Sequence, residues 1–146
     1  MVMESKYLNI FSKLTTEEAR AYYRLNGARV LVELLPKTEI KSKGGLIIST
    51  PKEVVRGGAE QMAGTIAIVL LTGVGYINDD GQPIDLEVSR GTVCLLNDFS
   101  IKTFSSFPGL QDYAANTIAL TEESAIQMQW PSIEAYLKYE AILNGN

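Results

Sequence analysis

Short runs of β-branched and aliphatic residues, each bounded by glycine or polar residues, fill the middle of the chain. They occupy residues 29–35, 65–71, 75–77, 92–96 and 117–120. Runs of this length between turn residues are typical of strands rather than helices. Several short strands in succession predict a mainly β domain, arranged as a small barrel or sandwich. Because the runs at 29–35 and 117–120 are the first and the last, we expect them to form its unpaired edges.

The residues before this β region carry a helix signal. Thr15 and Glu18 have the spacing of a capping box, in which each side chain bonds the backbone amide of the other residue. Residues 19–25 are expected to continue the helix. We therefore interpret residues 1–26 as an N-terminal helical extension and residues 27–130 as the β domain.

A second helix is expected near the C-terminal end. Pro131 ends the β region, and the residue after it, Ser132, is a favourable N-cap. The helix has one apolar face and ends before Gly145; that face holds Ile133, Tyr136, Leu137 and Ala141. Residues 131–146 then form a C-terminal helical extension, and a chain of 146 residues suits one domain with two short additions.

The composition excludes several classes of protein. The chain has no histidine and a single cysteine, Cys94, so it has no Ser-His or Cys-His catalytic pair, no histidine metal ligand and no intramolecular disulfide. With 13 basic and 17 acidic residues and no basic cluster, a nucleic-acid partner is disfavoured. The longest apolar run, residues 66–71, is too short to cross a bilayer, and no signal-peptide pattern is seen. We expect a cytoplasmic protein without a membrane partner.

The connection between the first two long strands is the most informative segment. Residues 37–64 hold five glycines, five lysines or arginines, and one aliphatic triplet, Leu46-Ile47-Ile48. Connections usually have about four to six residues, and much longer ones are generally functional. Three large aliphatic side chains on such a loop favour a docking motif over a solvated surface. The alternative is that residues 46–48 form a short strand that closes the barrel.

Other motifs have simpler interpretations. Gly73-Val74-Gly75 lacks the third glycine of a dinucleotide-binding loop, and no helix pattern follows it. Residues 78–81 lack the ligand spacing of a calcium loop, so we interpret them as a turn with Gly81 at a positive φ. Cys94 lies in an apolar run, where a cysteine usually packs as a small buried side chain.

Four stretches, taken in their order along the chain, resemble the GroES-like co-chaperonins of the chaperonin-10 family. They are Arg24–Val32, Lys41–Ile48, Gly73–Gly91, and the pair Val93–Asp98 and Leu120–Ile126. The resemblance covers about residues 24–129. It implies a small, partly open GroES-like β-barrel with a mobile loop at about 37–64 and a roof hairpin at about 73–85.

The resemblance also implies a function. The chain would be a co-chaperonin, a homo-oligomeric lid of seven subunits that caps a double-ring, GroEL-like chaperonin and encloses unfolded client proteins. The chaperonin-binding residues would be Gly44, Gly45, Leu46, Ile47 and Ile48. The chain would be no enzyme and would need no cofactor, because the nucleotide is expected on the chaperonin.

Two further groups of residues follow from the resemblance. Asp79, Asp80 and Gly81 would form the tip of the roof hairpin, close to the same residues of neighbouring subunits. Phe99, Phe104 and Phe107 would face the chamber. All three lie in the stretch from Phe99 to Tyr113, which is longer than in typical members.

The chain departs from the family pattern in several places. The proline usual in the first stretch is absent, both terminal extensions are additional, and about five residues are added after the triplet. Some phage-encoded members depart in comparable ways. One interpretation is therefore that the chain is phage-encoded and is located in the host cytoplasm.

Two other functions remain open. The first is a structural or scaffold protein, viral in some cases, that uses the barrel without binding a chaperonin. The second is a barrel domain of a dehydrogenase. The second would need a nucleotide-binding domain and zinc ligands that this sequence lacks.

Overall fold

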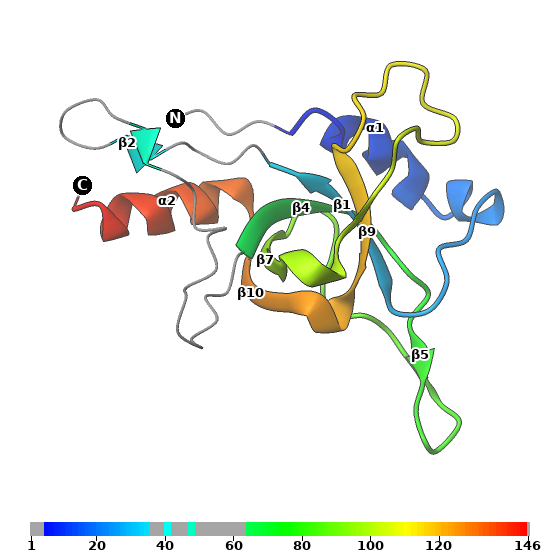
Figure 1. Cartoon of the computed structure of the whole chain (residues 1–146). Coiled ribbons are helices and arrows are strands. Elements are labelled where there is room, and N and C mark those ends of the chain that lie inside the picture. The colour runs from blue at the N-terminus through cyan, green and yellow to red at the C-terminus, as the bar shows by residue number, and fades with distance from the viewer. Residues whose placement is uncertain (1–4, 36–39, 42–46, 49–63, 146) are drawn as a thin grey trace.

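The computed structural model describes residues 5–35, 40–41, 47–48 and 64–145. Its centre is a six-stranded antiparallel sheet with the strand order β10-β7-β4-β1-β9-β8. The strands are β1 (Arg29–Leu34), β4 (Gly64–Thr72), β7 (Val93–Asn97), β8 (Lys102–Thr103), β9 (Ile118–Glu122) and β10 (Ile126–Trp130). The sheet curls around the core without closing, because β8 and β10 each have one paired neighbour in the described residues (Figure 1). The predicted mainly β, partly open fold is confirmed.

Two small ladders lie outside this sheet. Strand β2 (Ile40–Lys41) pairs with β3 (Ile47–Ile48), and β5 (Tyr76–Ile77) pairs with β6 (Pro83–Ile84). The β5–β6 hairpin extends away from the body of the sheet (Figure 1).

The sheet is covered on both faces, and this explains the long apolar runs of its central strands. Side chains alternate between the two faces of a strand. One face carries the small buried residues Val30, Val32, Ala67, Val69 and Cys94. The other carries Leu31, Ile68, Leu70 and Ile118, which pack against Tyr7 and Phe11 from the N-terminal segment and Trp130 from β10. A strand buried on both faces reads as a continuous apolar run, as residues 66–71 do.

The N-terminal helix lies elsewhere than predicted. The α-helix α1 spans Leu8–Ser12, followed by 3₁₀ turns at Lys13–Thr15 and Ala19–Ala21. The hydroxyl of Thr16, not Thr15, accepts the Ala19 N–H at 3.1 Å. The predicted capping box and the helix over residues 19–25 are therefore wrong. The reason is tertiary packing, because burial of Tyr7 and Phe11 places the α-helix before Thr15, at residues 8–12.

The predicted edges are also wrong. Strand β1 pairs with β4 on one side and β9 on the other, and β9 pairs with β1 and β8. The edges are β8 and β10 instead. The first and last apolar runs of the chain lie side by side at the centre of the sheet, a long-range pairing that the order of strands in the sequence does not indicate.

The C-terminal helix agrees with the prediction. Helix α2 spans Ile133–Leu143, and the Ser132 hydroxyl accepts the Ala135 N–H at 3.1 Å as an N-cap. Its first turns pack on the body through Trp130, whose ring centre lies 4.8 Å from that of Tyr136 and 5.2 Å from that of Tyr139. Burial and then the Glu140 carboxylate raise the pKa of Tyr136. None of the helices in the described residues is both long and apolar enough to span a membrane.

Candidate functional site

The aliphatic triplet of the long loop is described only in part. Ile47 and Ile48 form β3, whose backbone pairs with Lys41 and Ile40 of β2. This ladder is separate from the six-stranded sheet, so β3 does not close the barrel. Leu46, Gly44 and Gly45 lie outside the described residues, and the docking role of the triplet stays a prediction.

The turn of the β5–β6 hairpin is held by the Asn78 side chain. Its Oδ1 accepts the N–H of Asp80 at 3.0 Å and of Gln82 at 2.9 Å. Gly81 has φ +77° and donates its N–H to the Asn78 carbonyl at 3.0 Å. The interpretation of residues 78–81 as a turn with a positive φ at Gly81 is confirmed. Asp79 and Asp80 are exposed at the tip.

The root of the hairpin explains the two glycines of Gly73-Val74-Gly75. The N–H of Gly73 bonds the Arg29 carbonyl at 2.8 Å, and the N–H of Gly75 bonds the Gly27 carbonyl at 3.0 Å. A Cβ at Gly73 would overlap the Gly27 carbonyl oxygen, and a Cβ at Gly75 would overlap that of Ile84. The glycines permit close contact between backbones, which is a structural use of the motif.

The sides of the same hairpin are apolar and exposed. Val74, Tyr76 and Ile77 have exposed fractions of 50%, 48% and 71%. A projecting hairpin with an acidic tip and apolar sides is suited to contact with another protein surface rather than to the interior of its own subunit.

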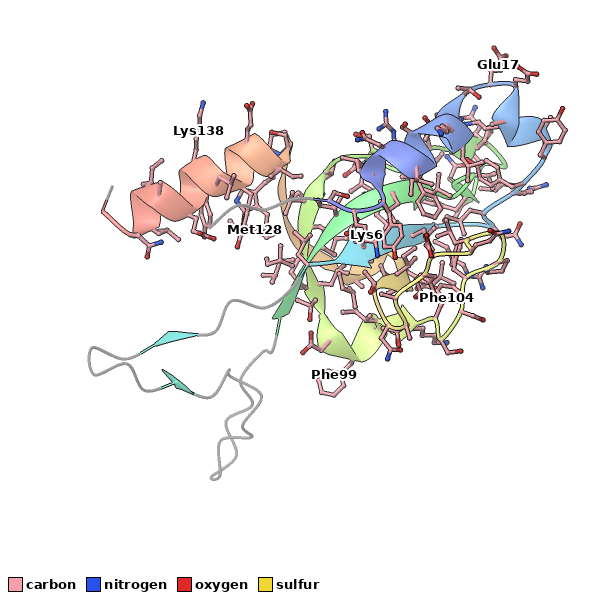
Figure 2. All side chains as sticks on the ribbon, turned by 90° about the horizontal axis from the view of Figure 1, so that it is seen from above. Lys6, Glu17, Phe99, Phe104, Met128 and Lys138 are labelled. Atoms are coloured by element: carbon pink, nitrogen blue, oxygen red, sulfur yellow. The ribbon has the colours of Figure 1, made fainter. Side chains whose placement is uncertain are left out.

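The three phenylalanines expected to face the chamber do not lie together. Phe99 is on the 3₁₀ turn Asp98–Ser100 and is 95% exposed, and Figure 2 shows its ring pointing away from the ribbon. Phe104 and Phe107 are half-buried and pack edge-to-face at 5.2 Å between ring centres. Of the three rings, only that of Phe99 is almost fully exposed to solvent. That any of them faces a chamber stays a prediction.

Phe104 and Phe107 belong to an aromatic cluster that joins the long loop after β8 to the N-terminal segment. Phe107 packs edge-to-face on Phe11 at 5.6 Å, and Tyr113 lies 6.3 Å from Tyr7. The Tyr7 hydroxyl accepts the Ala114 N–H at 3.3 Å. The N-terminal segment and the loop after β8 thus pack on one another and on the sheet.

A buried carboxylate anchors the N-terminal segment, and sequence reasoning missed it. Glu33 on β1 is 4% exposed and accepts the Ser5 hydroxyl at 2.6 Å, the Lys6 N–H at 3.0 Å and the Tyr7 N–H at 3.1 Å. A carboxylate buried among apolar residues requires such partners. A single glutamate inside the run 29–35 was the available signal.

A groove of about 530 Å³ separates the N-terminal segment from the hairpin root. It is lined by Arg20, Tyr23, Arg24, Leu25, Thr72, Gly73, Val74, Asp85 and Leu86. Two guanidinium groups, one carboxylate and several aliphatic side chains make a mixed surface, and no sequence motif had marked it.

Two negative findings concern chemistry at metals and thiols. In the described residues, no three or more cysteine, aspartate or glutamate side chains come together in a way that would hold a metal ion. Cys94 is fully buried, as predicted, and burial raises the pKa of its thiol from 9.0 to about 12.

Comparison with known proteins identifies one family. The family model described as "Chaperonin 10 Kd subunit" matches residues 23–135, which include the long loop, the hairpin and the whole six-stranded sheet. The curated proteins contain no match to this chain. Most of the N-terminal segment and all but the first turn of α2 lie outside the matched range.

Proposed function

Because this chain belongs to the chaperonin 10 family, we propose that it is a co-chaperonin that caps a double-ring, ATP-dependent chaperonin and encloses a folding client protein. Seven copies would form the lid, with a mass of about 112 kDa from chains of 16.0 kDa. The lid acts by binding and enclosure rather than by catalysis, and it works in the cytoplasm, which is that of the host if the chain is phage-encoded.

The observation that carries this proposal is the order of two features inside the matched range. A long glycine-rich loop with an aliphatic triplet precedes a projecting acidic hairpin, and both lie within residues 23–135. The first is suited to docking on an apolar groove and the second to contacts among neighbouring subunits. The exposed Phe99 gives the lid an aromatic surface for an unfolded client.

In this scheme, each loop binds weakly, because its glycines make the free loop costly to order. Several loops on one ring bind together at high effective concentration. The ring therefore holds firmly while the chaperonin presents its grooves, and it leaves when the nucleotide state of the chaperonin withdraws them.

Co-elution with a purified double-ring chaperonin, with and without ATP, tests the proposal. We expect the chain to elute with the chaperonin only when the nucleotide is present. A ring that never binds any chaperonin would favour the structural or scaffold function instead, and a monomer would contradict both.

A further inference from the structure

The tripeptide Leu-Asn-Gly occurs twice in this chain, at residues 25–27 before β1 and at residues 143–145 at the end of α2. Asparagine is among the chemically labile residues of proteins. When glycine follows it, the backbone nitrogen of the glycine can attack the side-chain carbonyl carbon, because glycine has no Cβ to obstruct the approach. Since the two tripeptides are identical, a difference in their reactivity must come from the fold.

The first asparagine, Asn26, is open to this reaction. It is exposed, in the connection between the 3₁₀ turn Ala19–Ala21 and β1. Within the described part of the chain, its side-chain amide has no hydrogen-bond partner, and nothing accepts the N–H of Gly27. Gly27 has φ +63°, and no atom lies within 4 Å of the position that a Cβ would take. No hydrogen bond therefore holds the two reacting groups apart.

The second asparagine, Asn144, is held by the end of α2. Its Nδ2 donates to the Glu140 carbonyl at 2.8 Å, and the N–H of Gly145 donates to the Ile142 carbonyl at 3.2 Å. The Gly145 nitrogen must lose its proton, and the Asn144 side chain must turn toward it, before a bond can form between them. Both hydrogen bonds must break first, and each one adds to the barrier.

We propose that Asn26 is a site of spontaneous deamidation, with water as the co-reactant. The Gly27 nitrogen loses its proton and bonds to Cγ of Asn26, the Cγ–Nδ2 bond breaks, and ammonia leaves with that proton. Water from the solvent then opens the five-membered imide at one of its two carbonyls. Opening at Cγ gives aspartate. Opening at the backbone carbonyl gives isoaspartate, in which the main chain runs through Cβ and Cγ.

The isoaspartate product is expected to loosen the base of the β5–β6 hairpin. The carbonyls on either side of Asn26 hold this base, because Leu25 accepts the Val74 N–H and Gly27 accepts the Gly75 N–H, each at 3.0 Å. Figure 1 shows the chain before β1 passing the base of the hairpin. Isoaspartate adds one carbon to the main chain between the two carbonyls, a length of about 1.5 Å. Two hydrogen bonds cannot both keep their geometry after such a shift.

Peptide mass spectrometry of the full chain, aged while folded at mildly alkaline pH, tests the proposal. Trypsin releases residues 25–29 and 139–146, which contain one tripeptide each. Deamidation raises the mass of a peptide by about 1 Da, fragmentation assigns the change to its residue, and synthetic peptides identify aspartate and isoaspartate by their retention times. We expect Asn26 to react at least about tenfold faster than Asn144, because only Asn144 must break two hydrogen bonds.

The same measurement in guanidinium chloride is the control for the fold. The two asparagines have the same neighbours in sequence, so their rates should become similar once the chain is unfolded. Equal rates in the folded chain, or no product at Asn26, would overturn the site. A difference that persists unchanged in guanidinium chloride would also overturn it, because the fold would not be its cause.

Hydrogen exchange at Val74 and Gly75 tests the effect on the hairpin. Both amides should exchange faster in aged wild type than in fresh protein. Asn26→Gln can form only a less favourable six-membered ring, so ageing should leave its exchange unchanged. Asn26→Asp carries the new charge without the added carbon and should behave as fresh protein does. Unchanged exchange in chains that contain isoaspartate would overturn the loosening of the hairpin. None of these measurements involves a chaperonin, so their outcomes are separate from the proposed function.

Discussion

The carboxylate of Glu33 on β1 accepts the backbone N–H of Tyr7 at 3.1 Å, joining two residues that are 26 positions apart in the chain. Ser5 and Lys6 donate to the same carboxylate, and the Ser5 hydroxyl accepts the Leu8 N–H at 3.0 Å. One buried side chain therefore sets where the N-terminal segment enters the fold and where α1 begins.

Replacing Glu33 by alanine is expected to lower the free energy of unfolding by about 2–4 kcal/mol, because three donors lose a charged acceptor. Denaturant unfolding measures the loss, and trypsin cleavage at Lys6 or Lys13 should become faster. Glu33→Gln keeps the shape and one acceptor oxygen, so it should cost less. Equal losses for the two variants would contradict the role of the charge.

The two hairpin glycines form a matched pair for a second prediction. Gly75 and Gly81 have φ values of +93° and +77°, but a Cβ meets the Ile84 carbonyl only at Gly75. Gly81→Ala should cost about 1 kcal/mol from the left-handed backbone alone. Gly75→Ala should cost at least about 2 kcal/mol more, since the hairpin root must also move. Equal midpoints in thermal unfolding would show that the root tolerates the overlap.

Much of the fold could be predicted because its signals are local. The central strands lie within one or two residues of the apolar runs, and Ser132 caps α2 through a contact three residues away. The turn at residues 78–81 likewise depends on its own side chains. For these elements, the local chemistry and the tertiary fold agree.

The errors have non-local causes. Thr15 has a good capping pattern, but burial of Tyr7 and Phe11 decides where α1 lies. The edge strand β8 has only two residues, Lys102 and Thr103, both exposed, so no apolar pattern marked it. The groove of Arg20 and Arg24 combines segments about 50 residues apart. The docking role proposed for Ile47 depends on a partner, so it stays a prediction.

The Cys94 thiol predicts a dependence of stability on alkaline pH. Burial raises its pKa from 9.0 to about 12 in the folded state. As the pH rises, the unfolded state therefore loses this proton before the folded state does. The contribution of the buried, protonated thiol to the free energy of unfolding is complete below about pH 9 and is lost as the pH rises toward 12. From pH 8 to 10.5, the wild type should lose more unfolding free energy than Cys94→Ala, whose packing defect does not vary with pH. If the unfolding free energies of the two proteins fall in parallel over this pH range, the raised pKa of Cys94 is contradicted.

The acidic tip of the hairpin predicts a dependence of the ring on salt. Asp79 and Asp80 are exposed, and in the proposed ring they lie near the same residues of neighbouring subunits. Like charges repel less as the Debye length falls, to about 10 Å at 0.1 M salt. Asp79→Asn with Asp80→Asn should stabilise the ring at low salt and leave capping unchanged, as measured by native mass against dilution. Asp112→Asn, an exposed carboxylate on another loop, serves as the control, and a ring no more stable than this control would argue against close packing of the tips.

The docking triplet gives the most direct prediction about function. Burial of one aliphatic side chain contributes about 1.5–3 kcal/mol, and in a ring every loop carries the same change. Ile47→Asp should therefore abolish ATP-dependent co-elution with the chaperonin, because the loss is repeated in each of the tethered loops. Ring mass and thermal midpoint should change little, since β3 pairs with β2 and not with the six-stranded sheet.

The matched control for this change is Ile10→Asp, which introduces the same charge at an exposed aliphatic residue of α1. It should leave both capping and ring mass unaltered. If Ile47→Asp instead unfolds the chain or breaks the ring, residue 47 contributes to the folded body and the docking hypothesis is wrong. If the variant remains folded and still co-elutes with ATP, the chaperonin is bound through another surface, and the exposed apolar sides of the hairpin, Val74, Tyr76 and Ile77, are the first to test.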